Sequence, residues 1–144
     1  MIAAARNSLA GIVLAVVLAA CADGPADSLL VTRYSDLAAN RFAPFERRVD
    51  DAATVAALEE AVRALPPYVE GRYCPNDAGL RYRLRFSRAG SPVQDGRLEA
   101  GGCRALRLSD GTVRETDDRF WGRLAGALGF PTRGHDLFVQ PLAR

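Results

Sequence analysis

Hydrophobic and polar residues alternate strictly between Leu80 and Phe86, where the sequence reads Leu-Arg-Tyr-Arg-Leu-Arg-Phe. Because successive side chains of a β-strand point to opposite faces, the apolar residues face one way and the arginines the other. The pattern predicts a half-buried antiparallel strand with a cationic outer face. The arginines on that outer face are Arg81, Arg83 and Arg85.

Two other stretches show helical spacing. In the first, Asp50 or Asp51 caps the start of the helix. The pair Pro66-Pro67 ends it, because proline lacks an N–H and clashes with the preceding turn. The apolar stripe of this helix consists of Val55, Leu58, Val62 and Leu65.

The second helix is predicted to be capped by Thr116, with Asp117 and Asp118 in its first turn, where the helix dipole favours anions. Gly129 is placed to end it, because glycine readily adopts the left-handed conformation that closes many helices. Its apolar stripe consists of Phe120, Trp121, Leu124, Ala125 and Leu128.

Four more segments combine strand-forming residues with flanking turn residues. They are residues 29–34, 42–49, 93–99 and 103–108, and residues 135–142 are a candidate for a short closing strand. Pro44 makes the second segment an edge strand or a bulge, because proline cannot donate to a strand ladder.

The element order is therefore β-β-α-β-β-β-α. This order favours an α+β sandwich of two layers, in which an antiparallel sheet of about five strands carries two helices on one face. Residues 29–144 would form this single domain. Within it, residues 131–144 are a candidate for a loosely ordered segment.

An uncharged apolar stretch runs from Leu9 to Ala20, behind a positive N-terminus that includes Arg6. Its length suits the core of an export signal and falls short of the roughly 20 apolar residues that a membrane-spanning helix needs. It ends in Leu18-Ala19-Ala20-Cys21, which resembles the lipobox of bacterial lipoproteins.

The lipobox resemblance implies that residues 1–20 are a lipoprotein signal peptide and that cleavage occurs before Cys21. It also implies that the Cys21 sulfur receives a diacylglyceryl group. Residues 21–28 would then be the lipidated cysteine and a short tether, which spans about 25 Å when stretched. Two alternatives stay open: Ala20-Cys21-Ala22 also fits the A-x-A site of a secretory signal that releases a soluble protein, and the apolar stretch could persist as an uncleaved anchor.

The three cysteines, at positions 21, 74 and 103, leave one thiol unpaired in an exported protein, which needs an explanation. Acylation of Cys21 would supply one, because Cys74 and Cys103 then form an even pair in an oxidising compartment. A disulfide between them would close a loop of about 30 residues and stabilise the fold by roughly 3–4 kcal/mol in the chain-entropy model. A metal site is the competing interpretation, but His135 is the only histidine and no C-x-x-C spacing occurs.

No constellation of residues indicates an enzyme or a cofactor site. His135 is followed by Asp136, but a hydrolytic triad also needs a positioned nucleophile, so we expect a surface histidine. Phosphate-binding and calcium-binding loop motifs are absent from the sequence. The acidic pairs are typical of helix capping and dipole groups, and they occur at Asp50-Asp51, Glu59-Glu60 and Asp117-Asp118. The sequence therefore predicts a non-enzymatic protein with no metal and no cofactor.

The balance of charge excludes one class of partner. The chain has 19 basic and 17 acidic side chains, which argues against a nucleic-acid-binding protein. The arginines at 81, 83 and 85 have two interpretations. They form either a solvated face that keeps the sheet soluble, or a contact surface for anionic lipid head groups or an acidic envelope protein. Arg104 and Arg107 would extend this surface if their strand were a neighbour.

Several segments together resemble small secreted lipoproteins of unknown function that are common in actinobacteria. The resemblance covers residues 29–130, and its pattern is Cys-Pro…Tyr-x-Leu-x-Phe…Gly-Cys. The matching segments are residues 51–58, 64–67, 74–86, 102–103 and 120–124. Membership implies a disulfide-bonded exported domain and no particular activity.

A looser similarity is to emfourin-type protein inhibitors of metalloproteases, which order a hairpin, a helix, a Tyr-x-Leu strand, a meander and a final helix. The chain lacks the Arg-Thr-Gly-Gly turn of that family, since Tyr34-Ser35-Asp36 follows Arg33, and it adds two cysteines.

The sequence thus predicts an exported protein. Its lipid would anchor it to the outer face of the cell membrane, or to an outer membrane where the organism has one. We expect a non-enzymatic binding or structural domain, with an envelope protein or anionic lipid head groups as its partner. The alternative is an emfourin-like inhibitor of secreted proteases. The oligomeric state stays open.

Overall fold

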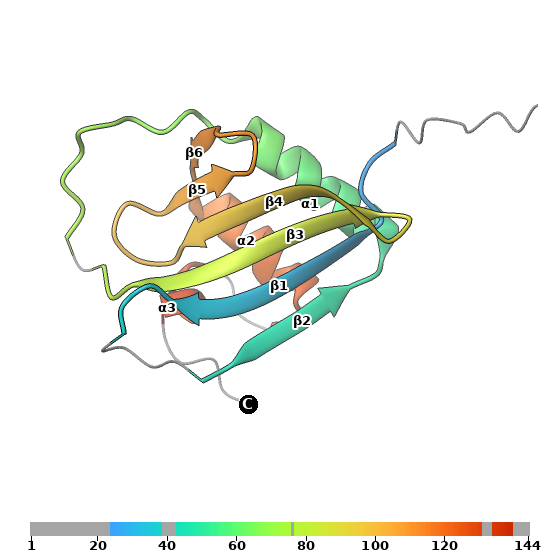
Figure 1. Ribbon diagram of the computed structural model, residues 1–144, viewed down its shortest axis with the longest axis horizontal. Coiled ribbons are helices and arrows are strands. Elements are labelled where there is room, and N and C mark those ends of the chain that lie inside the picture. The colour runs from blue at the N-terminus through green and yellow to red at the C-terminus, as the bar shows by residue number, and fades with distance from the viewer. Residues whose placement is uncertain (1–23, 39–42, 76, 131–133, 140–144) are drawn as a thin grey trace, which may run out of the picture.

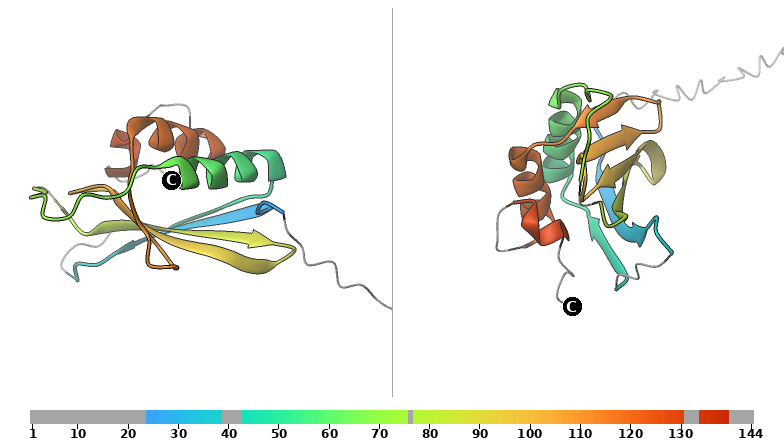
Figure 2. Two further views of the ribbon diagram at one scale, coloured as in Figure 1. Left: turned by 90° about the horizontal axis from the view of Figure 1, so that it is seen from above. Right: turned by 90° about the vertical axis from the view of Figure 1, so that its left-hand side faces the viewer.

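The computed structural model describes residues 24–38, 43–75, 77–130 and 134–139. Within them, an antiparallel sheet carries helices on one face, so the predicted two-layer α+β architecture is confirmed (Figures 1 and 2). The predicted signal peptide, residues 1–20, and the predicted lipidation site, Cys21, lie outside the described residues.

In chain order the elements are β1 (Ser28–Ser35), β2 (Phe45–Val49), α1 (Ala52–Ala64), β3 (Leu80–Arg88), β4 (Ser91–Glu99), β5 (Ala105–Leu108), β6 (Val113–Glu115), α2 (Asp118–Ala127) and α3 (Asp136–Val139). The strands lie in the order β2-β1-β3-β4-β5-β6. Between β2 and β3 the chain runs along the covered face of the sheet as α1, which brings β3 to the free edge of β1 (Figure 2).

The core lies between the sheet and the helices. The register places Leu29 opposite Phe86 and Val31 opposite Leu84, so the apolar residues of β1 and β3 share one face. The helices close this face with their own apolar stripes. The largest fully buried side chains are Trp121, Tyr82, Phe86, Phe120 and Phe138.

The structure corrects the predicted sheet. Within the described residues it has six strands rather than about five. The additional strand, β6, was not predicted, because it is only three residues long and reads Val-Arg-Glu, without apolar alternation. β2 begins at Phe45, after Pro44, and is therefore shorter than the predicted segment 42–49, of which residue 42 lies outside the described part. β4 begins at Ser91, two residues earlier than predicted.

The helix ends also differ in part. Asp51, not Asp50, caps α1 and accepts a hydrogen bond from the Thr54 N–H at 2.8 Å. Asp117 replaces Thr116 as the cap of α2, because its carboxylate accepts from the Phe120 N–H at 2.7 Å. The predicted end of α2 is confirmed: the helix stops at Ala127, and Gly129 has a φ of 73°.

The segment 136–139 forms the short helix α3 instead of the candidate closing strand, whose residues 140–142 lie outside the described part. Phe138 is completely buried, and its carbonyl oxygen accepts a hydrogen bond from the Tyr82 hydroxyl at 3.1 Å. Packing of one aromatic side chain against the core therefore decides the local conformation, which a short apolar run cannot indicate by itself.

Candidate functional site

The face of the sheet opposite the helices is uncovered in both views of Figure 2. Residues that alternate with the core positions of each strand point to this open face. Arg81, Arg83 and Arg85 all stand on it, as the alternation in β3 predicts, but the three side chains have different surroundings.

Arg81 is buried, with a side chain that is 9% exposed. Its guanidinium donates to both carboxylate oxygens of Asp77, at 2.8 and 2.7 Å, and its Nε lies 2.8 Å from Asp36 Oδ2. The hydrogen bonds from Arg81 lower the pKa of Asp77. Arg81 therefore ties the loops at one end of the sheet together, and this corrects its predicted place on an exposed cationic surface.

Arg83 and Arg85 share one carboxylate, that of Asp95 on the neighbouring strand β4. Arg83 contacts it through two hydrogen bonds, at 3.1 and 2.9 Å, and Arg85 through one at 3.4 Å. The hydrogen bonds from Arg83 lower the pKa of Asp95 below its ordinary value. The two arginines remain half-exposed, but their charge is partly neutralised within the sheet.

Three exposed arginines of this face form a row across the strands rather than along β3. Arg83 stands directly opposite Arg97 of β4, and Arg97 stands directly opposite Arg107 of β5. We call Arg83, Arg97 and Arg107 the cross-strand row. Arg97 was not among the arginines predicted on the outer face, although its position in the predicted strand 93–99 could have indicated that it belongs there.

Arg104 does not extend this row. It lies in the turn before β5 with a φ of 54°, and its guanidinium contacts Asp118 of α2 at 2.8 Å. The condition for the predicted extension is not met, because β4 lies between β3 and β5. Arg107 nevertheless stands in line with Arg83 through Arg97 of β4, whereas Arg104 does not.

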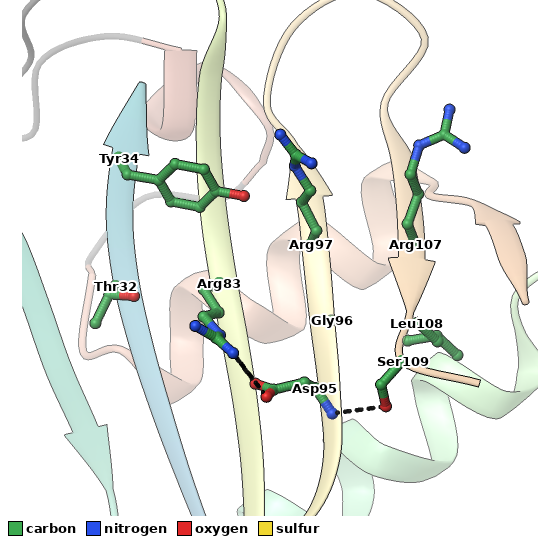
Figure 3. A pocket seen from close by; sticks show the side chains of 9 residues that line it. All are labelled: Thr32, Tyr34, Arg83, Asp95, Gly96, Arg97, Arg107, Leu108 and Ser109. Carbon is green, nitrogen blue, oxygen red and sulfur yellow. Dashed lines mark hydrogen bonds and ion pairs between the residues drawn. The ribbon is translucent and has the colours of Figure 1, made fainter. Parts of the chain in front are cut away.

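A hollow of about 660 Å³ lies over the cross-strand row (Figure 3). Tyr34 of β1 stands at one side of it, with its hydroxyl directed toward Arg97, whose guanidinium carbon is 5.9 Å from the ring centroid. Burial raises the pKa of the Tyr34 hydroxyl above its ordinary value. The hollow is lined by Thr32, Tyr34, Arg83, Asp95, Gly96, Arg97, Arg107, Leu108 and Ser109.

Carboxylates at the margin of the hollow hold two of these arginines. Arg97 donates to Asp36 at 2.5 Å, and this hydrogen bond raises the pKa of the guanidinium. The Nε of Arg107 lies 3.5 Å from a carboxylate oxygen of Glu99. What this arrangement offers chemically is a set of positioned hydrogen-bond donors with positive charge, which suits binding of an oxyanion.

Cys74 and Cys103 form a disulfide, as predicted, with Cα atoms 5.0 Å apart and a separation of 29 positions in sequence. The disulfide joins the connection between α1 and β3 to the turn between β4 and β5. It therefore closes one end of the sheet, and the competing interpretation of these cysteines as metal ligands is wrong.

The opposite end of the sheet holds the start of the described chain. Ala26 is buried, and its N–H donates to Glu59 Oε2 at 2.8 Å. The Asp27 N–H donates to the Ser87 carbonyl at 2.9 Å, and the Asp27 carboxylate accepts from the Ala89 N–H at 2.7 Å. Within the predicted tether 22–28, the part from Ala26 onward is thus fastened to the domain, and Ser28 already belongs to β1.

His135 is partly buried rather than a surface histidine. Its Nε2–H donates to the Ala100 carbonyl, and its ring lies edge-on to Trp121 with centroids 5.0 Å apart. Burial lowers the pKa of the imidazole. These contacts give His135 a packing role beside α2, and Asp136 starts the short helix α3.

The described residues contain no group of three or more His, Cys, Asp or Glu side chains arranged to hold a metal ion. No helix in the described part of the chain is long and apolar enough to cross a membrane. Comparison of the chain with protein-family models, curated proteins and solved structures gives no match. The resemblances to secreted lipoproteins and to emfourin-type inhibitors therefore stay predictions.

Proposed function

We propose that the chain is an exported bacterial lipoprotein, anchored by a lipid on Cys21, whose domain is a non-enzymatic binding module. The lipid would hold it on the outer face of the cell membrane, or on an outer membrane where the organism has one. The binding surface would be the open face of the sheet, and its partner an anionic group in the envelope.

The disulfide is the observation that carries the export and anchoring part of this proposal. Disulfides persist in oxidising compartments outside the cytosol, so the Cys74–Cys103 bond supports export. The bond also accounts for two of the three cysteines, and Cys21 is the thiol that is left for acylation. Leu18-Ala19-Ala20 precedes that thiol with the small residues that lipoprotein cleavage would need.

The fastened start of the domain restricts where a lipid on Cys21 would place it. Fully stretched, the chain from Cys21 to Ala26 spans about 18 Å, because one residue covers at most roughly 3.6 Å. Ser87 and Ala89, which hold Asp27, lie at the end of β3 and in the turn between β3 and β4. The disulfide lies at the other end of these strands, before β3 and after β4. Figure 1 shows the β3–β4 turn beside the start of β1. The membrane-proximal end would therefore be the β3–β4 turn.

The binding role is supported by the contrast between the two faces of the sheet. Helices bury one face, whereas the other carries a hollow with three opposed arginines and a tyrosine. Such a row of charged donors has no role in the core packing, and charge-assisted hydrogen bonds are the usual means of recognising anions.

Metabolic labelling with palmitate tests the anchoring. We expect the wild-type chain to incorporate the label and to fractionate with membranes, and Cys21→Ser to abolish both. The matched control is the double variant Cys74→Ser/Cys103→Ser, which removes the other cysteines and should keep the label. Unchanged labelling of Cys21→Ser would overturn the lipid assignment.

An inhibitor of secreted proteases is the second candidate. The observed order of a β1–β2 hairpin, α1, β3 with Tyr82-x-Leu84, a β3–β6 meander and α2 is the order that the emfourin resemblance implies. An inhibition assay against secreted metalloproteases decides this candidate: absence of inhibition at micromolar protein would remove it.

A further inference from the structure

We infer that the hollow on the open sheet face is a binding site for a phosphate group, held between the guanidinium groups of Arg97 and Arg107 and the hydroxyl of Tyr34. The inference deepens the proposed function, on which it rests only in taking the open face as the binding surface. It does not depend on lipidation of Cys21.

Like charges oppose each other in the cross-strand row. Directly opposed residues of antiparallel strands have Cα atoms about 4.5–5.5 Å apart, and like charges at such positions are destabilising. Asp95 offsets the positive charge of Arg83, from which its carboxylate accepts two hydrogen bonds. Arg97 and Arg107 stand opposite each other with one carboxylate contact each, so the repulsion between them is compensated least.

The two arginines also supply N–H donors, since a guanidinium carries five N–H groups. Asp36 accepts from one Nη of Arg97, and the Tyr34 hydroxyl is a second hydrogen-bond partner of that guanidinium. Glu99 approaches the Nε of Arg107 at 3.5 Å. Both side chains are 51% exposed where they line the hollow. An oxyanion entering the hollow would find several donors from two adjacent strands.

Tyr34 adds a neutral donor beside these charges. Figure 3 shows its hydroxyl oxygen directed toward Arg97, with which Tyr34 forms a side-chain hydrogen bond. A phenolic oxygen that accepts from a guanidinium keeps its own hydrogen for donation to an anion. Burial raises the pKa of this hydroxyl, which therefore keeps its proton at neutral pH. The ring also lies against the Arg97 guanidinium and restricts its orientation.

The chemistry favours phosphate over carboxylate. One guanidinium satisfies both oxygens of a carboxylate, as Arg83 does for Asp95 in the same row. A phosphate monoester has three terminal oxygens and nearly two negative charges, so it can bridge two guanidinium groups and accept from a hydroxyl. Asp36, Asp95 and Glu99 at the margin oppose it electrostatically, which predicts weak binding of inorganic phosphate alone, with a dissociation constant in the millimolar range.

Titration of the full chain with inorganic phosphate tests the site. The protein, in neutral detergent at constant ionic strength, is followed by the NMR signals of backbone amides and arginine Nε–H groups. We expect saturable shifts confined to Gly96–Leu98, Leu106–Leu108 and the arginines of the row. The double variant Arg97→Gln/Arg107→Gln should weaken binding at least tenfold, while its circular dichroism spectrum stays that of the wild type.

Arg48→Gln is the matched control. Arg48 is an exposed arginine of β2, stands opposite Leu30 on the same face, and is held by Asp50 at 2.6 Å, outside the hollow. The change removes one positive charge from the same face, half of what the double variant removes, and should leave phosphate affinity within twofold of the wild type. An equal loss in this variant would show that overall charge, not the site, attracts phosphate.

Three further results would overturn the inference. An affinity for acetate equal to that for phosphate would make the hollow a carboxylate site. Shifts that grow linearly with phosphate would show screening without binding. Phosphate binding that survives in Arg97→Gln/Arg107→Gln would place the site elsewhere.

Two probes distinguish a soluble phosphomonoester from a lipid head group as the source of the phosphate. Binding of glycerol 1-phosphate at least as tight as that of inorganic phosphate supports a soluble phosphomonoester. Binding of the Cys21→Ser chain to vesicles that contain phosphatidic acid, whose head group is a phosphate monoester, supports a lipid source if it is lost in Arg97→Gln/Arg107→Gln. Failure of both probes overturns the site as a biological one. A negative palmitate result would overturn anchoring alone, since the phosphate titrations report on Arg97 and Arg107 and do not depend on a lipid at Cys21.

Discussion

Tyr82 and Arg83 are consecutive residues of β3, and they lie in opposite environments. The Tyr82 ring is completely buried and packs edge-on to Phe138, with centroids 5.4 Å apart. Arg83 points to the open face, where its side chain is 51% exposed and paired with Asp95. One face of the sheet is thus held by apolar packing, and the other by ion pairs in contact with water.

The difference between these faces separates stability from binding. Burial of apolar area supplies most of the folding free energy, whereas exposed ion pairs contribute about 0–1 kcal/mol each. The open face can therefore carry opposed arginines at little cost to folding. Arg81 is the exception, because it stands on the open side but is buried between two carboxylates.

The largest effect is expected on the covered face. Trp121 is completely buried and contacts Phe138, with ring centroids 4.8 Å apart. Trp121→Ala should lower the free energy of unfolding by about 3–5 kcal/mol, since it leaves a cavity in the core. Urea denaturation measures the loss. Gly122→Ala is the control: its Cβ would meet no atom within 4 Å, and alanine favours the helix, so stability should rise slightly.

The second effect concerns the end of the sheet rather than either face. The disulfide closes a loop between residues that are 29 positions apart. Cys74→Ser/Cys103→Ser should lower the free energy of unfolding by about 3–4 kcal/mol, because the unfolded chain gains entropy. Guanidinium denaturation of the oxidised wild type and the variant measures it. A loss below about 1 kcal/mol would show that the denatured state keeps this loop closed by other contacts.

The third effect compares two arginines of the open side. Arg81→Met should cost about 2–3 kcal/mol, because Asp36 and Asp77 would lose a buried hydrogen-bonding cation. Arg83→Met should cost under about 1 kcal/mol, because its pair with Asp95 is exposed. Chemical denaturation of both variants gives the comparison directly. Equal losses would contradict the distinction between the two arginines.

The smallest effect is a dependence on pH. Asp77 and Asp95 have pKa values below the ordinary aspartate value because arginines donate to their carboxylates. The stability that they contribute is complete above the unfolded pKa of about 3.9, and it is lost as the pH falls through the lower folded values. The free energy of unfolding should therefore decline below about pH 4. Asp77→Asn/Asp95→Asn should flatten this decline, which denaturation at a series of pH values would show.

Strong local patterns predicted much of this fold. The alternation in 80–86 placed β3 and its buried face correctly, and the proline pair after α1 marked the end of that helix, because proline acts on its own backbone. β6 escaped prediction, since its pairing with β5 and not its composition makes it a strand. The candidate site was predicted only in part: alternation put Arg83 on the outer face, but no local pattern pairs Arg97 with it.

The sequence by itself determined the α+β class, the main helices and strands, and the even pair of cysteines that forms the disulfide. These follow from periodicity, turn residues and cysteine count, all of which act over short stretches or by parity. The tertiary structure alone decided that Arg81 is buried while Arg97 and Arg107 stand opposite each other on the open face. The reason is physical: strand register and loop packing bring together groups that are far apart in sequence, and these neighbours decide whether an arginine holds the fold or faces a ligand.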